Sequence, residues 1–202
     1  SRDKPPMVHC WLGHEGVEYA VVWNGCDTLL CLNDVGEEVW RQRIGDSSIW
    51  AMSASADADL IAVVTDSGVI GFDIDGNESF KFLGAFKNVH VFPDSSMVLV
   101  DSNDRARFYQ SPEHFSHVVG DEEKVVGLAG CGDNLAIKLD KKLVILAASG
   151  EVVGEKEFAS SVRLLEPYED GTMLLIGEES GELHLVDHEF NEIFNYRLAG
   201  PV

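Results

Sequence analysis

The sequence lacks several features that would point to a particular class of protein. No run of 18 or more apolar residues occurs in the 202 residues, so the sequence contains no candidate transmembrane helix. It also contains no CxxC pair, phosphate-binding loop, dinucleotide-binding glycine motif, zinc-protease motif or nucleophile elbow. We therefore expect neither a catalytic activity nor a metal, a cofactor or a membrane partner.

Positive charge is scarce. Fifteen Lys and Arg residues stand against 35 Asp and Glu residues, which gives a formal net charge of −20 at pH 7. Such a field repels phosphate backbones, so we expect no nucleic acid partner, whereas a basic protein or peptide is attracted. The acidic residues are spread along the chain, which also fits a solvated surface that keeps the protein soluble.

The four cysteines have no spacing typical of a metal site or a disulfide framework. Cys10, Cys31 and Cys131 lie in or beside apolar runs, where a free cysteine behaves as a small buried hydrophobic residue. This usage favours a reduced, intracellular protein, so we expect a cytoplasmic location.

What the sequence has instead is a β pattern. Short runs rich in Val, Ile, Leu and Phe are separated by Gly, Asp, Asn and Ser at intervals of 8–12 residues. Five segments begin alike, and their leading aliphatic residues are Val8, Ile49, Val89, Val125 and Val162. The intervals between these residues are 41, 40, 36 and 37, and each segment contains four strand-like runs.

A period near 40 with four antiparallel strands per unit predicts a β-propeller. We expect a single all-β domain over residues 1–202 with about five four-stranded antiparallel blades. The predicted blades span about 7–45, 46–84, 85–120, 121–159 and 160–200. Two closures remain open: the five blades form a complete ring, or the chain is part of a larger propeller or assembly. An incomplete propeller would expose blade faces and self-associate.

The passage from the third to the fourth strand carries a family resemblance. It reads LNDVGEEVWRQRIG, FDIDGNESFKFLG, LAASGEVVGEKEFA and VDHEFNEIFNYRLAG in four of the units. A turn is followed by a fourth strand, which begins with an aromatic residue at Trp40, Phe80 and Phe194. This pattern resembles quinoprotein-type (PQQ-like) and WD40-like propeller repeats. The resemblance implies the architecture alone, because the residues with which quinoprotein enzymes bind their cofactor are not found here.

The residue after each leading aliphatic residue defines a column in the repeat. Its members are His9, Trp50, His90, Val126 and Arg163. Propellers usually bind ligands where their first strands line the channel mouth, so we predict a ligand-binding site at His9, Trp50, His90 and Arg163. Such a set could hold a small anion or a peptide carboxylate. Alternatively these side chains fill the channel and stack on one another. A neighbouring column of Trp11, Met52, Phe92, Leu128 and Leu165 is predicted to be core.

Three further patterns receive a structural interpretation. DIDGNE, from Asp73 to Glu78, begins like a calcium loop, but Gly84 occupies the twelfth position, so we predict a turn. His184 and His188 lie about 13 Å apart on a strand, too far for one zinc ion. All four Trp residues lie in the first quarter of the chain, and we expect them to pack inside, an exposed aromatic patch being the alternative.

Together these observations favour a non-catalytic propeller that acts as a scaffold and binds a protein or peptide, with a basic partner preferred. One alternative is a small-molecule-binding, glycan-binding or enzymatic propeller that uses the channel mouth. Another is a structural piece of a larger propeller or assembly.

Overall fold

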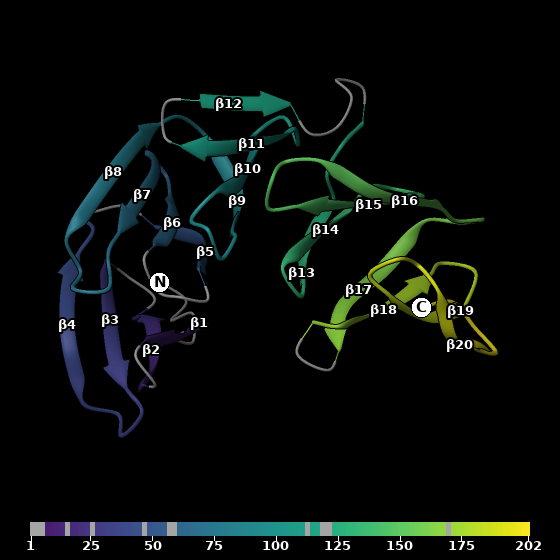
Figure 1. Cartoon of the computed structure of the whole chain (residues 1–202), viewed down its shortest axis with the longest axis horizontal. Helices are drawn as coiled ribbons and strands as arrows, with labels where there is room; N and C mark the ends of the chain where they lie inside the picture. Colours follow the sequence, from purple (N-terminus) through teal and green to yellow (C-terminus); the bar gives the residue numbers. More distant parts are fainter. Residues whose placement is uncertain are drawn as a thin grey trace. The chain divides into compact units, whose positions relative to one another are not determined.

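The computed structural model describes residues 7–14, 17–24, 27–45, 48–55, 60–111, 114–117, 123–168 and 171–202 (Figure 1). Within these ranges the chain forms twenty β-strands. No helix long and apolar enough to cross a membrane occurs among the described residues.

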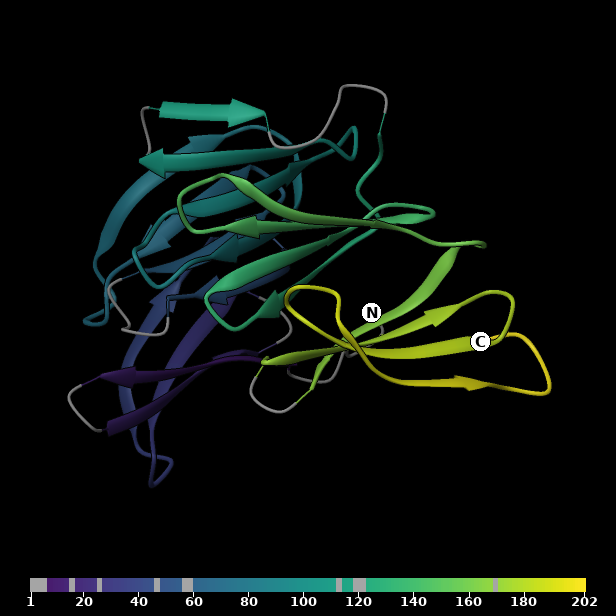
Figure 2. The ribbon, with the colours of Figure 1, turned by 45° about the vertical axis from the view of Figure 1, so that its right-hand side comes forward.

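The strands form five four-stranded sheets, each built from four consecutive strands (Figure 2). The first sheet contains β1 (Met7–His14), β2 (Val17–Trp23), β3 (Thr28–Asn33) and β4 (Glu38–Arg43). The second contains β5 (Ile49–Ala54), β6 (Ile61–Thr65), β7 (Gly68–Phe72) and β8 (Glu78–Leu83). The third contains β9 (Phe86–Val91), β10 (Met97–Asp101), β11 (Ala106–Ser111) and β12 (His114–His117).

The fourth sheet contains β13 (Gly127–Cys131), β14 (Asn134–Lys138), β15 (Lys142–Ala147) and β16 (Val152–Glu157). The fifth contains β17 (Val162–Tyr168), β18 (Met173–Glu178), β19 (Glu182–Asp187) and β20 (Glu192–Arg197). Each sheet falls within one of the five predicted blade spans, and the predicted all-β architecture of four-stranded antiparallel units is confirmed.

The chain divides into two compact units. The first unit comprises Ser1–Ser102 and Tyr109–Phe115, and the second comprises Asn103–Phe108 and Ser116–Val202. The first and second sheets therefore belong to the first unit, and the fourth and fifth sheets belong to the second.

Buried apolar residues join neighbouring sheets inside each unit. The core between the first and second sheets contains Val21, Trp23, Leu29, Cys31, Trp40, Ile49, Met52, Ile61, Val63, Ile70 and Phe72. In the second unit, the fourth and fifth sheets share a core that contains Ala129, Cys131, Ala136, Leu143, Ile145, Phe158, Val162, Leu174, Ile176 and Val186. Burial of these side chains supplies the main stabilisation, about 25 cal/mol for each Å² of apolar surface removed from water.

The turn between the third and fourth strands has the same construction in several sheets. The Asp73 carboxylate accepts hydrogen bonds from the backbone N and the Nδ2 of Asn77, at 2.7 and 3.0 Å. Asp187 receives the same two bonds from Asn191, at 2.9 and 2.8 Å. Gly76 takes the left-handed conformation that this turn requires, with φ of 82°. The DIDGNE segment is therefore the predicted turn, and its first carboxylate is occupied by the turn itself.

Two of the tryptophans are buried and a third is exposed. Trp23 and Trp40 are buried, as predicted, and Trp40 Nε1 donates to the Ile74 carbonyl oxygen in the second sheet at 2.7 Å. Trp50, in contrast, is 54% exposed, so the expectation of burial is wrong for it. The side chain of Trp11 lies outside the described part of the chain. In the predicted core column, Met52 and Phe92 are buried and Leu128 and Leu165 are half-buried.

Candidate binding surface at the first strands

A β-bulge interrupts the first strand of three sheets at the predicted column. The pairing register skips His9 in β1, Trp50 in β5 and Arg163 in β17. A bulged residue is left out of the ladder, which bends the strand and redirects the side chain. The column identified in the sequence therefore corresponds to a real structural position in these three sheets, although the His9 side chain lies outside the described part.

The third sheet departs from the prediction. In β9 the register passes from Phe86 to Asn88, so the bulged residue is Lys87. His90 lies three residues later, in the paired part of the strand opposite Val98. The sequence alignment took Val89 as the leading aliphatic residue, whereas Phe86 begins the strand. Lys87, not His90, is thus the structural equivalent of Trp50.

His90 has a packed environment. Its side chain is half-buried, and its ring meets the Phe92 ring edge-on with 4.9 Å between the centroids. Burial lowers the pKa of His90 to about 4, so the imidazole is neutral at pH 7. Ligand binding by His90 stays a prediction, and its place in the register separates it from the bulge column.

Trp50 is held at the surface of the first unit by a carboxylate. Its Nε1 donates to Asp66 Oδ1 at 2.7 Å, and Asp66 Oδ2 accepts from the Ser48 backbone N at 2.9 Å. The Ser48 hydrogen bond, followed by that of Trp50, lowers the pKa of Asp66 below its ordinary value. The site thus presents an exposed indole beside a carboxylate that stays ionised.

Arg163 has the equivalent arrangement in the second unit. Its side chain is 53% exposed and pairs with Glu179 Oε1 at 2.8 Å, which raises the pKa of the guanidinium. In both units the bulged residue is tied to an acidic residue sixteen positions later, in the turn after the second strand.

A second cation lies beside Arg163. Lys138 Nζ donates to the Arg163 carbonyl oxygen at 3.2 Å. Burial lowers the pKa of Lys138 and the Arg163 charge lowers it further, while Glu166 opposes both effects. Each of the two cations thus has a carboxylate close by, Glu179 for Arg163 and Glu166 for Lys138.

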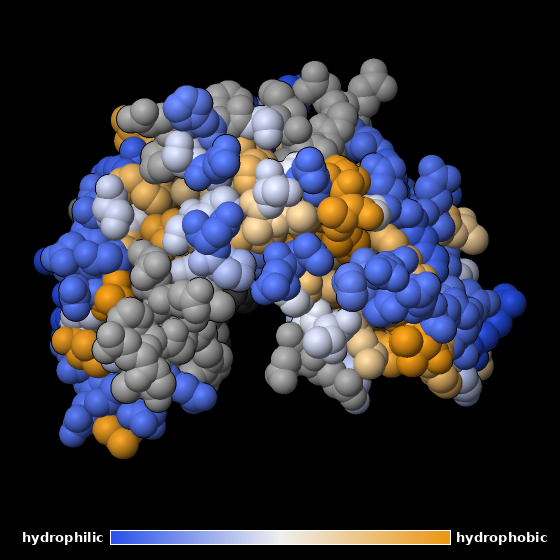
Figure 3. Space-filling view, in the orientation of Figure 1, coloured by the Kyte–Doolittle hydropathy of each residue, from blue (hydrophilic) through white to orange (hydrophobic). Residues whose placement is uncertain are grey.

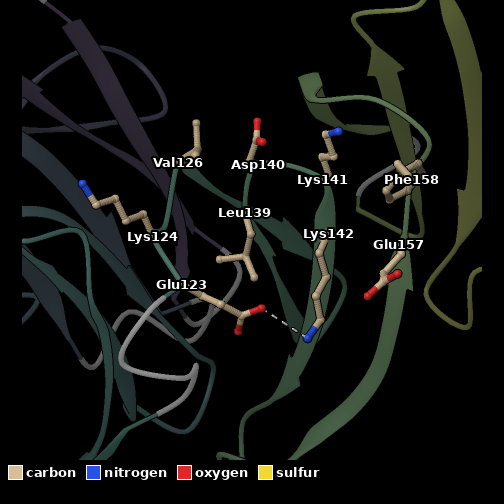
Figure 4. A pocket seen from close by; sticks show the side chains of 9 residues that line it. All are labelled: Glu123, Lys124, Val126, Leu139, Asp140, Lys141, Lys142, Glu157 and Phe158. Atoms are coloured by element: carbon tan, nitrogen blue, oxygen red, sulfur yellow. Dashed lines mark ion pairs between the residues drawn. The ribbon is translucent and has the colours of Figure 1, made fainter.

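A groove of about 660 Å³ lies at the fourth sheet in the second unit. Figure 4 shows the side chains that line it, which are Glu123, Lys124, Val126, Leu139, Asp140, Lys141, Lys142, Glu157 and Phe158. The Lys142 amino group is shared by Glu123 at 3.6 Å and Glu155 at 3.0 Å. Val126, the column residue of this sheet, is 60% exposed. The groove therefore combines apolar walls with charges of both signs.

A buried polar cluster in the fifth sheet escaped the sequence analysis. His184 lies between two carboxylates, with Nε2 at 3.0 Å from Glu178 and Nδ1 at 3.1 Å from Glu192. Glu178 also accepts from the backbone N and the hydroxyl of Ser160, at 2.7 and 3.1 Å. Burial favours the neutral acid, but these hydrogen bonds outweigh it and bring the pKa of Glu178 below its ordinary value.

This cluster links three strands to the segment before β17, which suits a structural role. The sequence did contain a signal for this cluster. His184 and Val186 occupy alternate positions of β19, so their side chains point to the same face of the sheet, and both are buried. Among the described residues, no group of three His, Cys, Asp or Glu side chains could hold a metal ion.

Five four-stranded sheets of one repeat pattern define a β-propeller repeat protein. No protein-family model and no curated protein matches the chain. Among solved structures, it is similar to the Cps50 (Swd1) β-propeller domain of Myceliophteria thermophila, with a TM-score of 0.67 and 14% identity. That match covers 95% of this chain and 71% of the other.

A second similar structure is BBS1N, solved in complex with ARL6DN. The TM-score is 0.61 at 11% identity, and the match covers 91% of this chain and 65% of that one. At such identities the similarity shows the fold alone. In both cases, part of the solved chain has no counterpart in this chain.

Proposed function

We propose that this β-propeller is a non-catalytic interaction module that binds a basic segment of a partner protein, with Trp50 as the central contact residue. The exposure of Trp50 carries the proposal: 54% of this large side chain faces solvent, beside an ionised carboxylate. Trp is among the residue types that most often dominate the energy of protein interfaces. The net charge of −20 draws basic segments toward the molecule.

The chemistry of the contact follows from the pair of side chains. A Lys or Arg of the partner stacks on the indole face by a cation–π interaction. Its charge is balanced by Asp66, which keeps the indole in place through the Nε1 hydrogen bond. Because the pKa of Asp66 is lowered, the carboxylate remains an anion through the physiological pH range.

The proposal also includes the type of repeat and the cellular location. The Asx turn followed by an aromatic residue, as at Asp73 and Phe80, supports a quinoprotein-type repeat. Cys31 and Cys131 are free and buried, which supports a reducing, cytoplasmic setting. Burial raises the pKa of the Cys31 thiol to about 11, so that thiol is unreactive.

Calorimetry with a lysine-rich and a glutamate-rich decapeptide tests the proposal. We expect the lysine-rich peptide alone to bind, with an affinity that falls steeply as the salt is raised from about 50 to about 500 mM. Trp50→Ala removes an interface anchor worth about 2 kcal/mol, so the affinity should drop about thirtyfold. Leu83→Ala is the matched control, because Leu83 is an exposed apolar residue (79%) of the same sheet. Unchanged affinity in Trp50→Ala, or binding that ignores salt, would contradict the proposal.

A second candidate function is a site for a small anionic ligand in the second unit, the channel-mouth alternative. The adjacent cations of Arg163 and Lys138 favour it. Titration with phosphate and with a small dicarboxylate should then give binding that Arg163→Ala abolishes, while the lysine-rich peptide still binds. Normal binding of both anions by Arg163→Ala would exclude this site.

A further inference from the structure

A histidine in the fifth sheet contacts a carboxylate with each of its two ring nitrogens. His184 lies in β19, with Nε2 at 3.0 Å from Glu178 of β18 and Nδ1 at 3.1 Å from Glu192 of β20. His184 and Glu178 are only 9% and 4% exposed, so the contact between them is shielded from water. All three residues belong to the second compact unit, which therefore contains the whole arrangement.

The two carboxylates determine how many protons the imidazole ring needs. An ionised carboxylate only accepts hydrogen bonds, and a neutral imidazole has one N–H donor, whereas an imidazolium has two. The hydrogen bond with His184 lowers the pKa of Glu192. Burial raises the pKa of Glu178, but hydrogen bonds from Ser160 and His184 outweigh it and bring the pKa below its ordinary value. With both carboxylates ionised, both contacts are hydrogen bonds only when His184 carries two protons.

The other neighbours of the ring come from β20 and the fourth sheet. Asn195 has its Nδ2 atom 3.4 Å from His184 Nδ1. The Phe158 ring meets the imidazole edge-on, with 5.8 Å between the centroids. Lys156 Nζ lies over that phenyl ring, 5.7 Å from its centroid, and its charge also acts on Glu192. The charged groups around the imidazole are therefore Glu178 from β18, Glu192 from β20 and Lys156 from β16.

The cluster connects the segment before β17 to the outer strand of the sheet. Glu178 accepts from the backbone N and the hydroxyl of Ser160, at 2.7 and 3.1 Å, and His184 continues this connection to Glu192 at the start of β20. Every residue of β20 is exposed, and Figure 3 shows hydrophilic as well as hydrophobic side chains on the visible surface of this region. The Glu192 side chain is 42% exposed, so the outer contact of the histidine is the one that water can replace.

We propose that His184 is a pH-sensitive clamp: as an imidazolium it ties β20 to the buried Glu178, and loss of its Nδ1 proton as the pH rises releases Glu192. Histidine is the side chain whose charge ordinarily changes near neutral pH. Once the proton has left, the Glu192 carboxylate faces a nitrogen lone pair, and the Asn195 amide is the donor that remains near Nδ1. The buried bond from Nε2 to Glu178 is kept.

The direction of the pH effect follows from the extra hydrogen bond. The protonated histidine makes this bond in the folded chain alone, so protonation favours folding. The contribution is complete below the ordinary pKa of a histidine and is lost as the pH rises through neutrality and above. Alkaline pH therefore loosens β20 while the backbone ladder of the sheet stays in place.

Long-range proton–nitrogen spectra of the 202-residue chain test the protonation state directly. We expect both ring nitrogens of His184 to carry a proton at pH 7, and only Nε2 to carry one when the pH is raised to about 9. The spectrum of His184→Gln identifies the signals. A ring with a single proton at pH 7 would overturn the proposal. So would a ring that keeps both protons at the higher pH, because the cation would then be a fixed part of the structure.

Thermal unfolding tests whether the proton stabilises the fold. We expect His184→Gln to lower the melting midpoint by about 4 °C at about pH 6, and by about 1 °C or less at about pH 9. His188→Gln is the matched control, because His188 is an exposed histidine that directly follows β19, and this variant should keep the pH profile of the original protein. Equal losses in His184→Gln at both pH values would overturn the proposal.

Hydrogen exchange tests where the clamp acts, and Glu192→Gln changes only its exposed arm. In the original protein, amides of β20 should exchange several times faster at about pH 9 than at about pH 6, each measured relative to amides of β4 in the first sheet. In Glu192→Gln this ratio should already be high at the lower pH and should change little. A purely structural cluster would leave the ratio independent of pH in the original protein, and that result would overturn the proposal even if His184→Gln failed to fold.

Discussion

The second and fifth sheets have the same backbone design and opposite surroundings. Both carry a bulge in the first strand and an Asx turn before the fourth strand. Both also carry an aromatic pair at matching register positions, Phe80 and Phe82 in the second sheet and Phe194 and Tyr196 in the fifth. In the fourth strand of the second sheet, β8, Phe80 and Phe82 are half-buried. In the fifth, every residue of β20 is exposed.

The difference separates the features that one repeat unit determines by itself from those that depend on the next unit along the chain. The turn, the bulge and the register depend on residues within one unit of about 40 residues. Burial depends on the unit that follows, as expected for repeat proteins, whose stability is a sum of unit and interface terms. An aromatic residue at the same register position is therefore half-buried against a core in one sheet and exposed in another.

The largest effect is expected where the following sheet covers its neighbour best. Trp40→Ala removes a buried indole and its hydrogen bond to Ile74, so we expect a loss of about 4 kcal/mol in the unfolding free energy. Urea denaturation measures this loss. A loss below about 1 kcal/mol would show that the contact between the first and second sheets contributes little.

Phe80→Ala and Phe194→Ala compare the same residue at the same register position. Phe80 packs against the core shared with the third sheet, so its removal should cost about 3 kcal/mol. Phe194 is 54% exposed, and its removal should cost less than about 1 kcal/mol. Equal losses of unfolding free energy in urea titrations of the two variants would contradict the expected difference between the second and fifth sheets.

Glu178→Gln tests the buried cluster of the fifth sheet. The change removes a charged acceptor shared by Ser160 and His184, and we expect a loss of about 2 kcal/mol at pH 7. Because the folded pKa of Glu178 is depressed, its contribution is complete above the ordinary Glu pKa and is lost as the pH falls through the folded value. The stabilities of the variant and the original protein should therefore converge below about pH 4. A constant difference down to low pH would contradict this role.

Gly36→Ala and Gly76→Ala give the smallest expected difference. Both glycines have φ near 80°, which costs an alanine about 1 kcal/mol. A Cβ at Gly76 would lie 2.9 Å from Trp40 Cδ2, whereas nothing lies within 4 Å at Gly36. Gly76→Ala should therefore cost about 1 kcal/mol more. Equal melting midpoints for the two variants would mean that the turn does not press on the indole.

Much of the fold could be predicted because it repeats. The period, the four strands per unit and the turn at Asp73 are each encoded within one unit. The bulges could not be predicted in every unit. In the third sheet Val89 was the obvious aliphatic start, and only the pairing partners of Phe86 and Asn88 reveal that Lys87 is the bulged residue.

The candidate site was predicted in part for the same reason. Trp50 and Arg163 were correctly placed in one column, but their acidic partners lie sixteen residues away and meet them through the hairpin. The cluster around His184 depends on contacts from three strands and the segment before β17. The exposure of Phe194 and Tyr196 depends on contacts beyond their own unit of the repeat, which no local pattern describes.

Hydroxyl-radical footprinting of the four matched aromatic residues tests the central claim most directly. Phe194 and Tyr196 should be oxidised several times faster than Phe80 and Phe82, because Phe80 and Phe82 are partly buried against the core shared with the third sheet, whereas Phe194 and Tyr196 are more than half exposed. Equal oxidation rates at the two pairs would contradict the account.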